Sequence, residues 1–229
     1  MDATDALSLV LSGDPVFFGI VGLSLLVSTT ATLLAALIGI PTGALIAVNS
    51  FPGRNVLIVL LNALMGLPPV VVGLSVFLLL SRSGPLGALG LLFTPSAMIV
   101  AQTILILPII AALTRQTVEE MWREYGEELA AMQVGGTGRV LTLIYEARFA
   151  LATIVLAGFG RAAAEVGAVM IVGGNIDGFT RVMTTTIALE TSKGNLALAV
   201  GLGIVLILLI MAINALTWTL KLWAERHAG

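Results

Sequence analysis

Arg161 and Glu165 stand four residues apart in a stretch, residues 149–172, that carries no other charge. At that spacing on a helix, the guanidinium and the carboxylate lie on one face and can neutralise each other. An ionisable group surrounded by apolar chain costs several kcal/mol unless it is paired or faces water, so both side chains should point into the protein. Two readings are open: the pair holds its helix among neighbouring helices, or it lines a polar pathway between them.

A second concentration of polar side chains lies between Arg115 and Arg148, a segment that holds ten of the 24 charged side chains (11 basic and 13 acidic). Residues 115–134 are mostly strong helix formers, with apolar side chains set among the acids. This pattern predicts an amphipathic helix that extends the preceding apolar stretch into water. So much charge on one short segment indicates that a soluble partner docks there.

Glu128, Ala130, Ala131 and Gly135 mark the point where this helix should end. Gly135 opens a glycine cluster, and glycine tolerates the positive φ of a sharp turn, so the cluster predicts a turn into a second helix from about Arg139. The two alanines give the turn a small face that another protein can approach closely. The alternative is an ordinary amphipathic surface helix that ends at a glycine cap.

The composition argues against several classes of site. The chain has no cysteine and a single histidine, His227, which removes disulfides, thiolate chemistry and histidine-rich metal sites. A net charge of -2 argues against a nucleic-acid partner. The sequence contains no Gly-x-x-x-x-Gly-Lys-Ser/Thr loop, so ATP hydrolysis is expected on a separate protein and no cofactor is expected on this chain.

Apolar runs long enough to cross a bilayer must position these groups. The chain is 58% hydrophobic and has a mean hydropathy of +1.08, which is typical of a multi-span membrane protein. We expect one all-α integral membrane domain over residues 1–229, with residues 1–15 forming a short helix on the membrane surface. Since a span needs roughly 20 apolar residues, spans are predicted near residues 16–48, 56–81, 95–114, 149–172 and 196–221, with residues 115–148 as the loop between the third and the fourth.

The basic residues predict the orientation. With the N-terminus outside, seven lysines and arginines fall on inner segments and three on outer segments, in keeping with the excess of positive charge on the cytoplasmic side. We therefore expect the N-terminus outside, and the C-terminus and residues 115–148 in the cytoplasm. Residues 173–195 would lie outside, where the part from Arg181 to Lys193 is too polar to span and predicts a short helix on the outer face.

Glu128-x-Ala130-Ala131-x-x-x-Gly135 resembles the EAA loop of ABC-importer permeases, a cytoplasmic element that inserts into a groove on the ATPase subunit. Its place between the third and fourth of five spans is the place that the family uses. Ala147-Arg148 departs from the Leu-Pro pair that commonly closes this element, which leaves the start of the fourth span open. The resemblance covers essentially the whole chain and favours the tungstate-specific branch of the molybdate, tungstate and sulfate permeases, through Gly158-Phe159-Gly160-Arg161, Glu165-Val166-Gly167-Ala168 and Val172-Gly173-Gly174-Asn175-Ile176.

The resemblance implies the five-span fold of type I ABC-importer permeases, with cytoplasmic coupling helices, in the cell membrane. It implies a non-catalytic subunit that moves an oxyanion, tungstate before its congeners, by alternating access, with ATP and Mg²⁺ bound to separate ATPase subunits. A second copy of the chain, an extracytoplasmic oxyanion-binding protein and membrane lipid are the other implied partners. The implied sites are the ATPase-coupling residues Glu128, Ala130, Ala131 and Gly135, the path or gate residues Arg161 and Glu165, and the binding-protein contacts Asn175, Asp177, Arg181 and Glu190.

Several alternatives stay open at this point. The anion can be molybdate or sulfate, because these oxyanions share charge and shape with tungstate. A stand-alone secondary anion transporter or channel would require ionisable residues in several spans or duplicated halves, and the sequence has neither. An intramembrane enzyme would require converging nucleophile and base groups, where the spans hold only one Arg/Glu pair. Residues 173–195 can also be an ordinary connecting loop.

Overall fold

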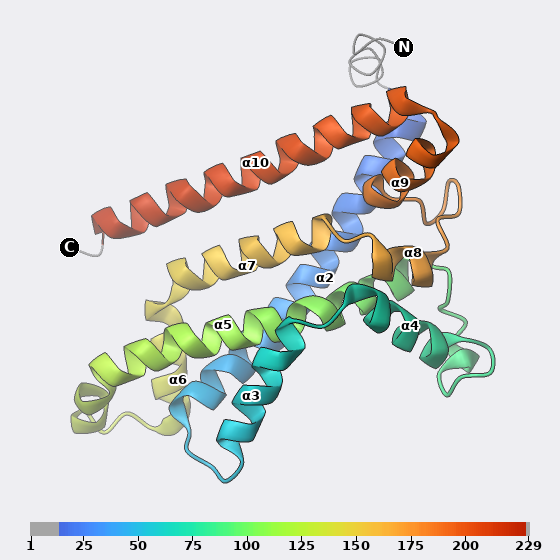
Figure 1. The fold of residues 1–229 in the computed structure, drawn as a ribbon. Helices are drawn as coiled ribbons and strands as arrows, with labels where there is room; N and C mark the ends of the chain where they lie inside the picture. Colours follow the sequence, from blue (N-terminus) through green and yellow to red (C-terminus); the bar gives the residue numbers. More distant parts are fainter. Residues whose placement is uncertain (1–13, 228–229) are drawn as a thin grey trace.

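The chain folds into helices joined by short turns, and no strand occurs in residues 14–227, the part that this computed structural model describes (Figure 1). The side chains of residues 220, 221 and 223–227 are outside that description. The predicted all-α class is confirmed, while the surface helix expected at residues 1–15 falls almost entirely outside the described residues. The helices are α2 (Pro15–Val48), α3 (Arg54–Met65), α4 (Pro69–Leu80), the 3-10 turn η1 (Gly87–Leu89), α5 (Pro95–Ala131), α6 (Gly136–Glu146), α7 (Arg148–Ala163), α8 (Gly167–Gly173), α9 (Met183–Lys193) and α10 (Leu196–His227).

Three of these helices, α2, α5 and α10, are long and apolar enough to cross a bilayer. Two pairs, α3 with α4 and α6 with α7, pass the same test together but are bent by 101° and 71° at a short break. By length and composition the described residues therefore hold three spans, or five if each bent pair counts as one. The predicted first span and the predicted extension of the third span into a long helix are confirmed by α2 and by the uninterrupted α5.

The second predicted span, residues 56–81, is wrong as a continuous helix, because α3 ends at Met65 and α4 begins at Pro69. Pro68 and Pro69 cause the break. Proline lacks the N–H that a helical hydrogen bond needs, and it forces the residue before it out of the α region. Pro68 accordingly has an extended ψ of 124°. The Pro-Pro pair is visible in the sequence, but the hydropathy of residues 56–81 does not reveal that it breaks the helix.

The fourth predicted span, residues 149–172, is also divided: α7 ends at Ala163, α8 begins at Gly167, and residues 164–166 form a break. α8 packs directly on α4, and a Cβ added at Gly73 of α4 would lie 2.7 Å from the Cα of Ala168. The two divided spans therefore meet each other. At the other end of α7, Ala147 separates α6 from α7, so the chain turns at the point where the sequence departs from the Leu-Pro pair.

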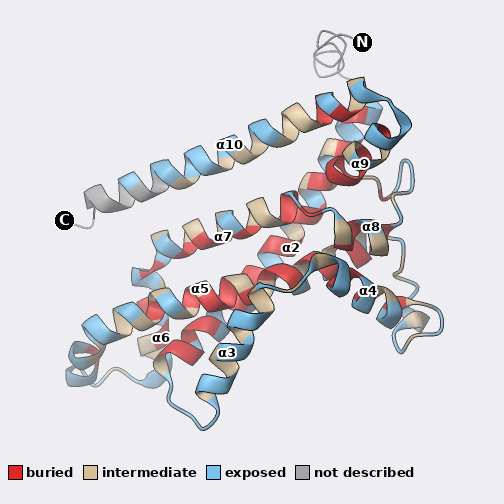
Figure 2. Cartoon of the chain, in the orientation of Figure 1, coloured by how far each residue is buried: buried red, intermediate tan, exposed pale blue. Residues whose placement is uncertain are grey.

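The core is centred on α2 and α5, which pack along much of their length. Small residues allow the close approach: a Cβ at Gly43 would lie 2.4 Å from the carbonyl oxygen of Ala111. Helices in lipid associate through such small residues, because lipid tails are as apolar as the side chains and leave little hydrophobic drive. Figure 2 shows buried residues concentrated on α2, α5 and α8, whereas α10 is largely exposed beyond its first turns. α10 packs mainly on α7 and α9, so most of its apolar surface is left for lipid or another chain.

Candidate functional site

Arg161 and Glu165 meet at the break between α7 and α8. Arg161 Nη1 donates to Glu165 Oε2 at 2.6 Å, and Glu165 Oε1 accepts the Ala168 N–H at 3.1 Å. Only 4% of the Glu165 side chain is exposed, against 39% of the Arg161 side chain. Arg161 lies in the last turn of α7, but Glu165 lies beyond the end of that helix. The predicted pair forms, although it joins the end of one helix to the start of the next instead of lying on one continuous helix.

Side chains from two other helices hold this break. Thr184, on α9, donates its hydroxyl to the Glu165 carbonyl oxygen at 2.7 Å, and Gln102 Nε2, on α5, donates to the Ala162 carbonyl oxygen at 3.1 Å. The Ala162 carbonyl oxygen also accepts the Glu165 N–H at 3.0 Å, so Gln102 adds a second donor at the end of α7, while Thr184 supplies a donor to a carbonyl inside the break. Sequence reasoning missed both residues. Gln102 carried a signal, because it is the only amide side chain in the apolar run 95–114.

A small cavity of about 10 Å³ lies beside the break. Gln102 Oε1 is buried there without a hydrogen-bond partner among the described residues. The volume is close to the smallest that holds one water molecule, so no oxyanion fits in this conformation. The polar side chains that line the cavity come from α2, α5, α9 and the break: Ser24, Ser28, Gln102, Glu165 and Thr184.

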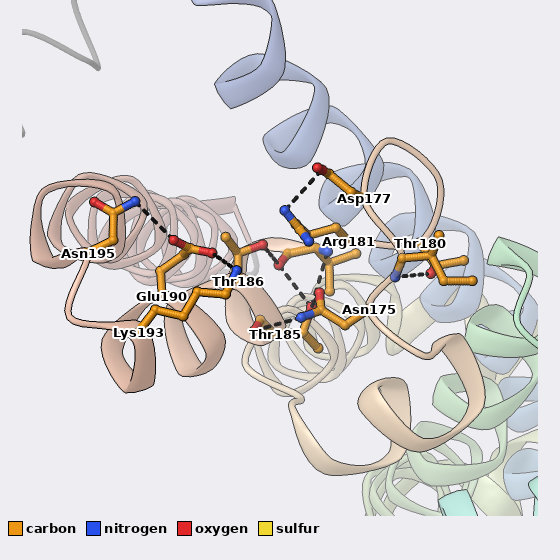
Figure 3. Close-up of polar contacts among 11 residues, drawn as sticks. Asn175, Asp177, Thr180, Arg181, Thr185, Thr186, Glu190, Lys193 and Asn195 are labelled. Atoms are coloured by element: carbon orange, nitrogen blue, oxygen red, sulfur yellow. Dashed lines mark hydrogen bonds and ion pairs between the residues drawn. The ribbon is translucent and has the colours of Figure 1, made fainter.

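Asn175, Asp177 and Arg181, which are predicted to contact a binding protein, lie in the segment between α8 and α9 and make different contacts (Figure 3). Arg181 Nη1 pairs with Asp177 Oδ1 at 3.0 Å, and 71% of the Asp177 side chain is exposed. Asn175 has a φ of 51° and uses its side chain inside the protein: its Oδ1 accepts the Thr185 hydroxyl at 2.9 Å, and its Nδ2 donates to the Thr185 carbonyl oxygen at 3.4 Å. Asp177 therefore offers the exposed charge of this segment, whereas Asn175 shapes the turn.

Glu190 closes the turn between α9 and α10. Its carboxylate oxygens accept Lys193 Nζ and Asn195 Nδ2, both at 2.9 Å (Figure 3). Two hydrogen bonds hold the pKa of Glu190 below its ordinary value, and the one from Lys193 has a larger effect than the one from Asn195. The side chain is buried and both of its oxygens are engaged within the chain. That Glu190 contacts a binding protein stays a prediction. Its hydrogen bonds to Lys193 and Asn195 support a structural role at the turn between α9 and α10.

The helix predicted to lie on the outer face between Arg181 and Lys193 is α9, but its first residues are buried. The Thr186 hydroxyl donates to the Val182 carbonyl oxygen at 2.7 Å, the Thr185 hydroxyl accepts the Val182 N–H at 3.2 Å, and the Met183 N–H donates to Ser24 Oγ of α2 at 2.7 Å. A helix this polar can be buried because its hydroxyl groups find backbone acceptors. The first turns of α9 are thus part of the wall beside the break, whereas its last residues, 191–193, are exposed, and its place on the outer face stays a prediction.

The turn after α5 lies where the sequence predicts it, but a different residue adopts the left-handed conformation. Gln133, with a φ of 54°, occupies the left-handed position, and the Val134 and Gln133 N–H groups donate to the carbonyl oxygens of Leu129 and Ala130, the pattern of a Schellman motif. The prediction that positive φ at the glycines makes this turn is wrong: Gly135 is extended, with φ -64° and ψ 160°, and it is the N-cap of α6. α6 begins at Gly136, earlier than the predicted Arg139.

The four predicted coupling residues, Glu128, Ala130, Ala131 and Gly135, are all exposed at this turn. Leu129 is buried in the same core cluster as Val140 and Leu143 of α6, so the two helices are fixed to each other beneath the exposed face. A Cβ added at Gly135 would meet no atom within 4 Å. Sequence reasoning missed the large apolar side chains that are exposed at this turn and on α6: Met132, Leu141 and Tyr145.

Comparison with known proteins shows the family to which the chain belongs. No protein-family model matches the chain. It is 44% identical over 204 residues to a probable anion ABC transporter permease protein of Haloferax volcanii, an alignment that covers 86% of this chain and 87% of that protein. The chain belongs to the family of ABC transporter permease proteins. The permease is also similar to the tungstate uptake system permease proteins TupB of Peptoclostridium acidaminophilum (41% identity over 216 residues, 94% of this chain and 95% of that protein) and of Campylobacter jejuni (40% over 216 residues, 94% and 90%).

Family membership confirms several predictions. The permease is a multi-pass membrane protein and a non-catalytic subunit of a transporter. Sulfate permeases named CysW match it more distantly, at 26–28% identity. The roles of the individual site residues, which residues lie on which side of the membrane, and the stoichiometry stay predictions.

Proposed function

We propose that the permease imports tungstate as the membrane-spanning part of an ATP-driven transporter. Two relatives named for tungstate uptake share 40–41% of residues over 94% of the chain, and the sulfate permeases share 26–28%. Molybdate and sulfate have the same tetrahedral shape and charge, so binding-protein affinity is proposed to set the selectivity. The transported anion then passes the break between α7 and α8 on its way inward.

The exposure of the Arg161 side chain is the observation that supports this mechanism. On the single chain, 39% of its side chain is exposed, although it lies in an apolar helix. A guanidinium that faced hydrocarbon would cost several kcal/mol, so this side chain must face water or another protein chain. A second copy that packs against this face, with an aqueous path between the two copies, meets the requirement. Two copies of the permease are therefore proposed to enclose one path.

The divided helices give the path its chemistry. Arg161 offers guanidinium N–H groups to a passing dianion, and Glu165, which already binds Arg161, limits the net positive charge so that the anion is released. Breaks in membrane helices expose backbone groups where they line a cavity, and binding sites of transporters are commonly built from them. Here the α7–α8 break lies against α4, itself the second part of a divided span.

The turn after α5 is proposed to bind the ATPase. In the orientation that the basic residues predict, Glu128, Ala130, Ala131 and Gly135 lie in the cytoplasm, and the small exposed face and its acids meet a groove on the ATPase. Asp177 lies at the opposite end, where an extracytoplasmic binding protein would dock. ATP and Mg²⁺ on the ATPase drive transport only if they favour one permease conformation over the other.

Reconstitution tests the proposal. The permease, its co-expressed ATPase and the soluble binding protein are placed in proteoliposomes, and ATP hydrolysis and anion uptake are measured with tungstate, molybdate or sulfate on the binding protein. We expect uptake to require ATP and tungstate to be taken up at the lowest concentration. Uptake without an ATPase would contradict the assignment to an ATP-driven importer, and a preference for sulfate would contradict the assignment of the anion.

A further inference from the structure

Glu119 of α5 joins the second half of that helix to the turn between α2 and α3. Its Oε1 accepts a hydrogen bond from Arg54 Nη2, at the start of α3, at 3.2 Å. Arg54 also donates from Nε to the Ile46 carbonyl oxygen at 2.8 Å and from Nη2 to the Ala47 carbonyl oxygen at 3.4 Å, both in the last turn of α2. One ion pair therefore links three helices, and we call it the Glu119–Arg54 joint.

α3 has few other attachments. None of its residues is fully buried, and none belongs to an apolar core cluster of the described residues. Within the same part of the chain, every hydrogen bond from an α3 side chain to another helix comes from Arg54. α3 packs on α5 through half-buried residues. The joint is therefore the most specific contact that fixes the position of α3 relative to α5.

Both groups of the joint have further partners. Glu119 also pairs with Arg115 and Arg123, which lie four residues before and after it on α5. Arg54 has the two carbonyl oxygens of α2 in addition to Glu119. Loss of the joint therefore leaves neither group as an unpaired buried charge, the situation that strongly destabilises a fold. The permease should stay folded without the joint.

The joint lies on the part of α5 that a partner at the α5–α6 turn would move. Glu119 is about 18 Å from Ala131 along the helix, at 1.5 Å per residue, and no proline interrupts α5 between them. Pro108, the internal proline of α5, lies on the other side of Glu119. Displacement of the turn therefore reaches Glu119 before any bend at Pro108.

We propose that the Glu119–Arg54 joint carries displacement of the α5–α6 turn to α3, which makes Glu119 a positioning residue for transport. α3 is followed, at the Pro68–Pro69 break, by α4, and α4 packs on α8. In α8, the Ala168 N–H donates to Glu165. Motion of α3 thus has a route to the α7–α8 break that bypasses the bend in α5. The inference rests on the proposed function, because it requires an ATPase that moves the turn.

Two matched variants test the joint in the reconstituted transporter. Arg54→Gln removes the partner of Glu119 on α3, whereas Arg123→Gln removes one of its partners on α5 and leaves the joint in place. Both variants lower the positive charge around Glu119 by one. The permease is reconstituted with its ATPase and the soluble binding protein, and anion uptake is measured per ATP hydrolysed. Copurification of the ATPase and the Tm show whether each variant folds and assembles.

We expect Arg54→Gln to hydrolyse ATP but to lower uptake per ATP at least about fivefold, the lower end of the usual coupling between two sites. Arg123→Gln should keep the wild-type ratio. Arg54→Lys keeps the charge but lacks the guanidinium fork, so it should give an intermediate ratio. If Arg54→Gln does not assemble, Arg54→Lys decides the test, and a wild-type ratio there would overturn the proposal. An unchanged ratio in Arg54→Gln, or an equal fall in Arg123→Gln, would also overturn it.

Spin labels can report the motion directly, because the chain has no native cysteine. Cysteines at Asn55 on α3 and Glu127 on α5, both exposed, take the labels, and unlabelled chains are added in excess so that each transporter holds one pair. The distance between the labels should stay constant between the nucleotide-free and the ATP-trapped transporter, and it should change in Arg54→Gln. The same behaviour with and without Arg54 would overturn the proposal. Wild-type uptake without an ATPase would instead contradict the proposed function, whatever the variants do.

Discussion

Removal of Arg161 should destabilise the permease more than removal of both members of the Arg161–Glu165 pair. In Arg161→Ala, the Glu165 carboxylate stays buried, and the Ala168 N–H is its one remaining hydrogen-bond donor among the described contacts. Breaking a buried ion pair from one side costs about 3–5 kcal/mol. The lower value applies, because Arg161 is partly exposed and water already screens the pair. About 3 kcal/mol corresponds to a fall in Tm of about 6–12 °C for a chain of this size.

The double variant Arg161→Ala with Glu165→Ala removes the stranded charge. It loses the hydrogen bond to the Ala168 N–H, worth about 1 kcal/mol, so its Tm should fall by only about 2–4 °C. Arg161→Ala with Glu165→Gln is the matched control, because the glutamine amide oxygen can still accept that N–H. This control should recover nearly all of the wild-type stability. Arg161→Ala should then be about 2 kcal/mol less stable than the charge-free double variant, whereas two independent sites would make the double variant the less stable one.

Differential scanning fluorimetry in detergent gives the Tm of each variant, and uptake in proteoliposomes gives transport. If Arg161 contacts the anion, the charge-free variants should recover stability without recovering uptake. Recovery of both properties would remove the transport role and leave a purely structural pair. Stability losses that simply add would refute the view that the pair bridges the break between α7 and α8.

Three further predictions follow from the contacts. Gly135→Asp should fold normally, because aspartate is a good N-cap and its Cβ has open space, yet it should reduce ATPase copurification and binding-protein-stimulated hydrolysis; unchanged values would contradict the coupling role. Gly73→Ala should cost about 1–3 kcal/mol by overpacking α4 on α8, seen as a lower Tm, while Gly22→Ala on α2 should not destabilise. Glu190→Gln should lower the Tm at neutral pH, because the Glu190 carboxylate stabilises the fold only while it is charged. The difference in Tm from wild type should vanish as the pH falls through the depressed pKa of Glu190. A constant difference down to acid pH would contradict this.

Topology is tested in the same cysteine-free chain. A single cysteine at Asp177 should react with a membrane-impermeant thiol reagent in intact cells, and one at Thr137 should react only after lysis, because the excess of basic residues places the α5–α6 turn inside. Both positions are exposed, so access to the reagent depends on the side of the membrane and not on burial. The opposite pattern would place the turn where no cytoplasmic ATPase reaches it.

Hydropathy and helix propensity predicted the long helices well. α2 and α5 match expectation because each contains a long apolar run, and the internal proline, Pro41 or Pro108, does not end the helix. The same reasoning predicted spans 56–81 and 149–172 as single helices, because it weighed total apolar length above local backbone signals. Pro68-Pro69 was a readable signal for the first break. The second break depends on hydrogen bonds from Thr184 and Gln102, residues that lie far away in sequence, and a local pattern cannot show those partners.

The candidate site shows the same division. The pairing of Arg161 with Glu165 and the exposure of the α5–α6 turn were predictable, since both follow from short-range spacing and from the cost of charge in an apolar stretch. The identity of the left-handed residue was not, because glycine is the usual choice and Gln133 takes the position instead. The contact of Asn175 with Thr185 was also beyond reach, since the two lie ten residues apart and only the fold of the intervening turn brings them together. The partners of Glu190, Lys193 and Asn195, lie within five residues of it.

One helix joins the two halves of the candidate mechanism. α5 runs without interruption from Gln102, which holds the end of α7, to Ala131 at the exposed turn, a distance of about 44 Å at 1.5 Å per residue. A partner that moves the turn therefore acts on one continuous helix whose other part is bonded to the break beside Arg161. Pro108 lies between these points and leaves the carbonyl group of Ile104 without its helical donor, so bending is easiest near the break. Displacement of the turn should thus bend α5 at Pro108, and only the part of the motion that passes this bend should reach the hydrogen bond from Gln102 to Ala162.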